Sequence, residues 1–187
     1  MPYLIAAVVL VGALGLLNLV LSFGIIRRLR EQAAIGHHDP APDAGEKPWM
    51  ALQQQQVRPF AVETADGVRI DRDALPDRLL VAFLSATCDA CAQRLPRFRE
   101  VAGRLPRSQV LAIAVGPLEE TVALRTELAE FAQVAAEEDL GPVAAAFSVE
   151  GYPAFLMLDS AGVVLASGWD AGVFDKTPGL FPHDVAI

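Results

Sequence analysis

Apolar residues follow two different spacings between residues 57 and 168, and their order along the chain predicts an α/β fold. Near-continuous apolar runs such as "LLVAFLSA" are typical of strands that are buried on both faces of a sheet. Apolar residues at helical spacing follow these runs and predict helices between the strands. We therefore expect one sheet of mixed strand direction with helices on both faces. The predicted strands are 78–86, 109–116 and 133–136, and the predicted helices are 88–104, 118–132 and 141–149.

Turn residues predict two further pairs of strands, one at each end of this core. Asp66-Gly67 lies between two short strand-like segments, and this dipeptide favours a tight hairpin turn. The turn at residues 160–162 lies between the two apolar segments of residues 152–168. The side chains that we expect to face the core from the two longer helices are Leu95, Phe98, Val101 and Ala102, and Leu118, Val122, Leu128 and Phe131.

The segment from Tyr3 to Ile26 contains no charged residue. As a helix with a rise of ~1.5 Å per residue it would span roughly 36 Å, against about 30 Å for the hydrocarbon core of a bilayer. A cleaved signal peptide has a basic n-region and a shorter apolar core, whereas no Lys or Arg precedes this segment. We therefore predict one transmembrane anchor over residues 1–26. A cleaved signal peptide and a buried core helix are the alternatives.

Two segments flank the predicted globular domain at residues 57–168. Residues 27–56 are rich in Ala, Gly, Pro and short polar residues, and they predict a linker. Its adjacent His37 and His38 are expected to be solvated, because no cluster of Cys or carboxylates at ligand spacing accompanies them, and no metal site is predicted. Residues 169–187 are rich in Gly and Pro and show no helical period, so we predict an irregular C-terminal tail.

The net charge of −8 lies entirely in the part of the chain after residue 57, which has eleven basic and nineteen acidic residues. An acidic domain lacks the basic surface that nucleic acids require. It also gives no electrostatic reason for adhesion to anionic lipid. The charge therefore excludes these two classes of partner.

The two cysteines, Cys88 and Cys91, lie where a predicted buried strand is followed by a helix. A helix N-terminus presents N–H groups and a positive dipole end, and this environment favours a thiolate. The thiolate is the nucleophile in disulfide exchange. Cys91 lies one helical turn further along, where we expect it to be less exposed and near enough to resolve a mixed disulfide. Arg94 and Arg97 would add positive potential, whereas Asp89 would oppose it.

Three other interpretations of the cysteine pair remain open from the residues alone. The thiols could be incidental core residues, or two chains could share a zinc ion that is held by four cysteines. The third alternative is a peroxidatic cysteine. Ser85 could supply the hydroxyl that peroxiredoxins carry before this cysteine, but Val81 occupies the position of their proline.

The segments "LLVAFLSATCDACAQRLPRF" and "GYPAFLMLDSAGVVLASG" resemble the thioredoxin fold. More narrowly, the chain resembles membrane-anchored TlpA-like thiol-disulfide oxidoreductases, including the MauD-like branch. The resemblance implies a thioredoxin-like mixed sheet flanked by helices, preceded by one transmembrane helix. It implies that Cys88 and Cys91 are catalytic, and that Tyr152 and a cis Pro153 bind the substrate. Protein thiols and disulfides would be the substrates, with a membrane or soluble redox partner and no bound cofactor.

The chain departs from the family pattern at two places. Ala82 occupies the position of the buried acid that thioredoxins use for proton transfer, so Glu63 or water would have to serve instead. The helix that usually closes the fold is not evident after Gly168, so another segment would have to cover that part of the sheet. The Asp-Ala dipeptide between the cysteines also differs from the Gly-Pro of thioredoxin.

Two arguments disagree about the side of the membrane on which the domain lies. Arg27, Arg28 and Arg30 follow the anchor, and the positive-inside rule would then place the domain in the cytoplasm. The family resemblance places it on the extracytoplasmic face, and this is our prediction.

The predicted function is a membrane-anchored thiol-disulfide oxidoreductase that exchanges disulfides in protein substrates during the maturation of exported proteins. The alternatives are a non-catalytic thioredoxin-fold module that binds a partner beside Pro153, and a thiol peroxidase-like antioxidant.

Overall fold

The structure is a computed structural model that describes residue 12, residues 50–51 and residues 53–181. The predicted anchor, apart from residue 12, and most of the predicted linker lie outside the described residues. In the part of the chain that the structure describes, no helix combines the length and the apolar character needed to span a bilayer. The described residues from 50 onward belong to one compact unit, Gly45–Ile187.

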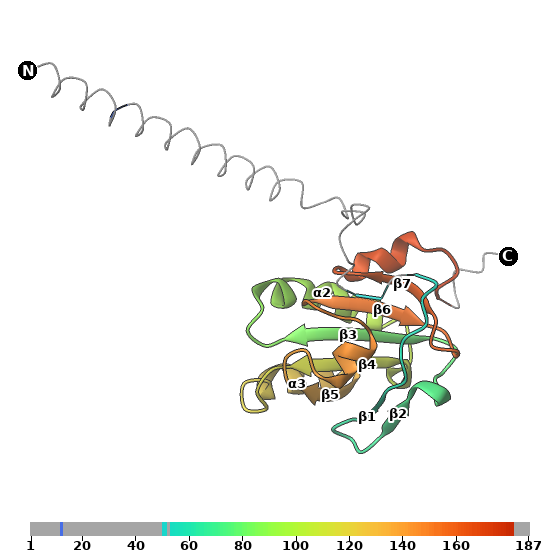
Figure 1. The fold of residues 1–187 in the computed structure, drawn as a ribbon, viewed down its shortest axis with the longest axis horizontal. Helices are drawn as coiled ribbons and strands as arrows, with labels where there is room; N and C mark the ends of the chain where they lie inside the picture. Colours follow the sequence, from blue (N-terminus) through green and yellow to red (C-terminus); the bar gives the residue numbers. More distant parts are fainter. Residues whose placement is uncertain (1–11, 13–49, 52, 182–187) are drawn as a thin grey trace, which may run out of the picture. The chain divides into compact units, whose positions relative to one another are not determined.

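A five-stranded mixed sheet lies at the centre of this unit, with the strand order β5-β4-β3-β6-β7 (Figure 1). β3, β4 and β5 are parallel to one another, whereas β6 and β7 are antiparallel to their neighbours. β1 and β2 form a separate antiparallel hairpin. The predicted mixed α/β sheet is therefore confirmed. The strands are β1 (Ala61–Glu63), β2 (Arg69–Asp71), β3 (Leu79–Ser85), β4 (Val110–Val115), β5 (Gln133–Glu137), β6 (Ala154–Leu158) and β7 (Val164–Gly168).

Helices cover both faces of the sheet. Alternate residues of the central strand β3 point to opposite faces, so they pack against different helices. Val81 and Phe83 belong to a buried cluster with Phe147, at the end of α4. This cluster also includes residues of the hairpin. Ala82 and Leu84 belong to a second cluster with Phe98 of α2. The helices are α2 (Asp89–Ala102), α3 (Val122–Ala129) and α4 (Pro142–Ala146), and the short 3-10 helices are η1 (Arg72–Ala74), η2 (Arg107–Gln109) and η3 (Ala171–Lys176).

The helix predicted at residues 118–132 is shorter in the structure, and two of its expected core residues are exposed. Residues 117–121 form a turn in which the Glu120 and Thr121 N–H groups donate to the Pro117 carbonyl, so α3 begins only at Val122. Leu118 lies in this turn and Val122 at the first helical position, and both side chains face solvent. The prediction that these two residues face the core was wrong, whereas Leu128 is fully buried as expected.

The ends of the domain also differ from the prediction. At the N-terminal end, Met50 and Ala51 of the predicted linker are buried, and the Ala51 N–H donates to the Phe147 carbonyl at 2.9 Å. At the C-terminal end, residues 171–176 form η3, and Ala171 and Phe174 are fully buried in the same cluster as α2. This segment covers the sheet where the sequence shows no closing helix.

Candidate dithiol site

Cys88 lies at the N-terminus of α2, directly after the carboxyl end of β3. Every residue from Leu79 to Leu84 is buried, and the strand ends at Ser85. Cys88 has an extended backbone (φ −98°, ψ 107°) and is the N-cap residue of α2. Its Sγ accepts a hydrogen bond from the Cys91 N–H at 3.2 Å, the role that a Ser or Asp oxygen commonly has at this position. The sulfur is thereby held at the positive end of the helix dipole.

The two thiols have different environments. Cys88 is partly exposed, whereas the Cys91 side chain is 3% exposed, and both cysteines are free thiols. Burial, together with a hydrogen bond with Cys88, raises the pKa of the Cys91 thiol to about 12. The positive charge of Arg94 acts in the opposite direction. An accessible sulfur therefore lies in front of a buried thiol that is held protonated.

Tyr152, which precedes Pro153, lies against the first cysteine. The Cys88 thiol donates a hydrogen bond to the Tyr152 carbonyl oxygen, with an Sγ–O distance of 3.7 Å. The Tyr152–Pro153 peptide bond is cis, as the resemblance implies. Pro153 is buried, and β6 begins at the next residue. The structure thus brings together all four residues that the sequence singled out, although they are separated by about sixty residues along the chain.

The Tyr152 side chain reaches from the dithiol to the loop between β5 and α4. Its hydroxyl accepts a hydrogen bond from the Leu140 N–H at 3.1 Å. Partial burial raises the pKa of Tyr152, and the neighbouring Asp139 raises it further. Glu137, the last residue of β5, holds the first turn of α4: its carboxylate accepts hydrogen bonds from the Val143 and Ala144 N–H groups at 2.9 and 2.8 Å. Tyr152 therefore links the loop between β5 and α4 to the dithiol.

A cluster of three residues beside Cys91 combines α2 with the C-terminal segment. The Arg94 guanidinium lies over the Trp169 ring, 5.6 Å from the ring centroid. Its Nε forms an ion pair with Oδ2 of Asp170 at 3.5 Å, although this buried nitrogen has no hydrogen-bond partner among the described residues. Sequence reasoning considered Arg94 but missed Trp169 and Asp170, because nothing in their local pattern indicates that they return to α2. Arg94 follows Cys91 by three residues and therefore lies on the same side of the helix.

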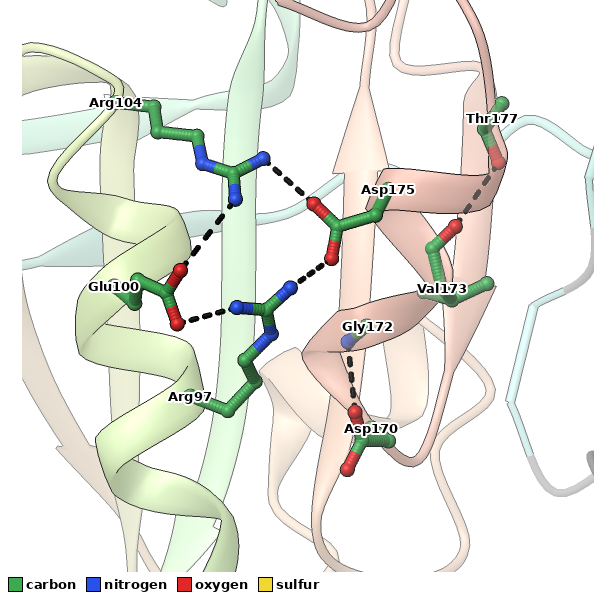
Figure 2. Close-up of polar contacts among 8 residues, drawn as sticks. All are labelled: Arg97, Glu100, Arg104, Asp170, Gly172, Val173, Asp175 and Thr177. Carbon is green, nitrogen blue, oxygen red and sulfur yellow. Dashed lines mark hydrogen bonds and ion pairs between the residues drawn. The ribbon is translucent and has the colours of Figure 1, made fainter. Parts of the chain in front are cut away.

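Arg97 does not face the dithiol in the way that the sequence suggested. Its guanidinium pairs with Glu100 of α2 and with Asp175 of η3 (Figure 2). Arg104, just beyond α2, also pairs with Asp175, at 2.6 Å. The charge of Arg97 is therefore neutralised within a network that joins η3 to α2.

Glu63 does not replace the missing acid at Ala82. Ala82 is fully buried in the cluster that contains Cys91. Glu63 is an exposed residue of β1, and the neighbouring Val62 packs against the cluster on the opposite face of the sheet. No group of three or more potential ligands that could hold a metal ion occurs among the described residues.

Comparisons with known proteins agree with this architecture. No family model and no curated protein matches the chain. Among solved structures, the thioredoxin domain of a thiol-disulfide oxidoreductase from Bacteroides vulgatus has 14% sequence identity and a TM-score of 0.57, and the match covers 68% of this chain and 95% of that one. A thiol:disulfide interchange protein from a Bacteroides species has 14% identity and a TM-score of 0.54, with 70% and 89% covered. The described unit thus has a thioredoxin-like fold.

Proposed function

We propose that this chain is a membrane-anchored thiol-disulfide oxidoreductase that exchanges disulfides in protein substrates through Cys88 and Cys91. The observation that carries the proposal is the asymmetric dithiol. Cys88 is accessible at a helix N-cap, and Cys91 is buried one turn behind it. Solved structures with a similar fold include proteins named as thiol-disulfide oxidoreductases, which supports the same class of chemistry here.

The exchange proceeds in two steps. The Cys88 thiolate attacks one sulfur of a substrate disulfide, the substrate S–S bond breaks, and the other substrate sulfur leaves as a thiolate. Cys91 then loses its proton and attacks Sγ of Cys88 in the mixed disulfide. The second substrate sulfur leaves, so the substrate gains two electrons and the protein holds a Cys88–Cys91 disulfide. A dithiol of a redox partner reduces this disulfide again, and the same steps in reverse oxidise a substrate.

The carbonyl of Tyr152 positions the substrate. Its oxygen lies 3.7 Å from Cys88 Sγ, so a segment that pairs with this backbone would carry its own sulfur past the nucleophile. Recognition of an extended segment by backbone pairing depends little on the amino-acid sequence of the substrate, because every polypeptide has these backbone groups. Pro153 shapes this edge of the groove.

We place the membrane anchor at residues 1–26 and the catalytic domain on the extracytoplasmic face, where it would act in the maturation of exported proteins. The uncharged segment from Tyr3 to Ile26 supports the anchor. Disulfide chemistry supports the location, because stable protein disulfides occur mainly outside the cytoplasm. A reporter that is active only outside the cytoplasm, fused to the C-terminus, should be active. Activity of a cytoplasm-only reporter at the same position would contradict this location.

Trapping of the mixed disulfide tests the proposed reaction. In cells, Cys91→Ser should accumulate disulfide-linked adducts of Cys88 with substrate proteins, because the second step is blocked. The matched control is the Cys88→Ser/Cys91→Ser double variant, which should form none. If Cys91→Ser forms no adduct, the exchange mechanism is wrong. If Cys88→Ser keeps the cellular function, the chain is a binding module.

A further inference from the structure

Two loops leave the sheet at the same edge as the dithiol. In the register of the parallel strands, Ser85 of β3 lies beside Val115 of β4, and Val115 lies beside Glu137 of β5. The Gly116 N–H donates to the Glu137 carbonyl at 3.0 Å, which joins the two strand ends. Residues 116–121 and 138–141 therefore begin at the edge where β3 leads to Cys88, and in Figure 1 these strands point the same way.

The loop at residues 138–141 is one side chain away from the nucleophile. Tyr152 contacts Cys88 through its carbonyl oxygen and Leu140 through its hydroxyl. Asp139 also interacts with the Tyr152 hydroxyl. A substrate segment that reaches Cys88 along Tyr152 would consequently meet this loop.

Exposed apolar side chains are concentrated on these two loops and at Val122, the first residue of α3. Leu118 is 64% exposed, Val122 is 56% exposed and Leu140 is 54% exposed. The one other large hydrophobic residue that is exposed in the described part of the chain is Val68, in the turn of the hairpin. Three of the four thus lie at the dithiol edge. Exposed apolar residues beside a reactive group are candidates for a binding surface.

The backbone at Leu140 supports a binding role for this residue. Its φ of 52° lies in the left-handed region, which is uncommon for a branched apolar residue and costs on the order of 1 kcal/mol or more. Asn or Gly would adopt this conformation at lower cost. An exposed leucine here adds nothing to the core, so stability does not explain its presence.

The loops are also strongly acidic. Glu119 and Glu120 are exposed on the first loop, and Glu138 and Asp139 are exposed on the second. Asp89 adds a further exposed carboxylate between the cysteines. Neither loop contains a Lys or Arg, and Arg94 is engaged with Asp170. Arg125, in α3, is the next basic residue after the first loop.

We propose that Leu118, Val122 and Leu140, with the acidic residues around them, form a docking surface for a disulfide-bearing polypeptide segment that is both apolar and positively charged. The inference rests on the proposed function and adds the substrate class to it. Apolar side chains of the segment cover the exposed leucines and valine. Lys or Arg residues beside the substrate cysteine complement the four carboxylates, which raises the association rate and excludes acidic segments.

Two peptide disulfides of equal length test this surface on the full-length protein. One carries Lys and Leu beside its cysteine, and the other carries Glu and Leu. We expect kcat/KM to be about tenfold higher for the basic peptide at about 0.05 M salt, and the ratio to fall towards one at about 0.5 M salt, because salt screens exposed charges. Equal rates for the two peptides at low salt would overturn the proposal.

Variants of the carboxylates show which of them cause the preference for the basic peptide. Glu119→Gln/Glu120→Gln should reduce the preference for the basic peptide by about threefold or more, whereas Asp73→Asn/Asp77→Asn, in the segment before β3, should leave it unchanged. Equal effects of the two double variants would mean that overall charge, and not this surface, sets the preference.

Leu140→Asn separates binding from folding. Because Asn accepts a positive φ more readily, this variant should be at least as resistant to urea as the wild type, yet have a KM for the basic peptide several-fold higher. Val68→Ser is the control and should change neither the resistance to urea nor the KM for the basic peptide. An unchanged KM in Leu140→Asn would contradict the apolar part of the surface.

Failure of this inference is distinguishable from failure of the proposed function. Reduction of a small neutral disulfide by the wild-type dithiol reports on Cys88 and Cys91 alone. If this reaction proceeds but the peptides are not discriminated, only the docking surface is wrong. If neither the small disulfide nor any peptide reacts, the oxidoreductase function is wrong, and the docking surface falls with it.

Discussion

The difference in exposure between Cys88 and Cys91 sets the order of the proposed steps. A substrate disulfide can reach the exposed Cys88. The buried Cys91 can react only with the mixed disulfide between Cys88 and the substrate. Burial raises the pKa of Cys91 to about 12, so the thiol is protonated at neutral pH and does not compete as the first nucleophile. The same burial makes loss of its proton the demanding part of the second step.

Arg94 is the charged residue that should ease this proton loss. Its positive charge lowers the pKa of Cys91, although less than burial raises it. In a Cys88→Ser background, Arg94→Gln should slow alkylation of Cys91 by roughly threefold at pH 8, because the thiolate fraction falls. Below the pKa of Cys91, the alkylation rate of both proteins should rise about tenfold for each unit by which the pH increases. The measurement is the pH dependence of the iodoacetamide reaction.

Arg97→Gln is the matched control for Arg94→Gln. Its guanidinium is paired with Glu100 and Asp175, so its removal should leave the alkylation of Cys91 nearly unchanged. Equal slowing by the two variants would show that the stability of α2, and not the charge of Arg94, controls the thiol.

For individual residues, the sequence indicated the two cysteines of the proposed site but not the charged groups around them. The two-residue spacing after a buried strand was enough to predict that Cys88 caps a helix and that Cys91 is buried. The contacts of Arg94 with Trp169 and Asp170 join positions about 75 residues apart, and local spacing carries no signal for such a contact. The interior position of Ala82 was predicted, whereas the distance of Glu63 from it depended on how the hairpin packs.

Among the elements, η3 takes the place of a closing helix. It is a 3-10 helix, but Ala171 and Phe174 are fully buried against the face of the sheet that α2 covers. The polar link is Asp175, which lies between Arg97 and Arg104 in Figure 2. Glu100 contacts the same two arginines from the other side, so the four side chains form a closed network of alternating charge.

Asp175→Asn should reduce the free energy of unfolding by about 1 kcal/mol at pH 7, because the carboxylate is partly buried and doubly paired. Partial burial raises the pKa of Asp175, but hydrogen bonds from Arg104 and Arg97 outweigh it, and the net shift is downward. Since the folded pKa is depressed, the contribution is present above the unfolded pKa of about 4 and is lost as the pH falls through the folded value. Urea denaturation at pH 7 and at pH 2.5 measures this.

The control for this variant is Asp73→Asn. This change breaks the ion pair between Asp73 and Arg72, in which the Asp73 carboxylate is largely exposed. An exposed pair contributes about 0–1 kcal/mol, so this loss should be the smaller of the two. If both variants lose the same stability, or if the loss in Asp175→Asn persists at pH 2.5, the network does not act as described.

The predictability of the elements follows from their composition. β3 and β4 were predicted because a strand that is buried on both faces leaves an apolar run. The start of α3 was predicted too early, because Leu118 and Val122 continue a helical spacing across the Pro117 turn. η3 was missed because a short 3-10 segment among glycines and prolines has no period of its own, and its burial depends on Phe174 meeting α2.

For the whole molecule, the thioredoxin-like fold explains why residues from distant parts of the chain meet at one edge of the sheet. Parallel strands bring their carboxyl ends to the same edge, and β6 brings Tyr152 and Pro153 there from the opposite direction. The strand-to-helix order singled out Cys88 and Cys91, whereas Tyr152 and Pro153 were expected only from the resemblance to the thioredoxin fold. The anchor remains a prediction from the apolar segment at residues 3–26, which, apart from residue 12, lies outside the described residues.

The most direct test of the account is a redox titration of the full-length protein in a dithiol–disulfide buffer, followed by alkylation and intact-mass measurement. We expect one two-electron transition, in which molecules carry either two alkyl groups or none, because Cys88 and Cys91 are oxidised together. Partial alkylation of the reduced protein should label Cys88 before Cys91. Two thiols that stay alkylatable under oxidising conditions, or Cys91 reacting first, would contradict the central claim.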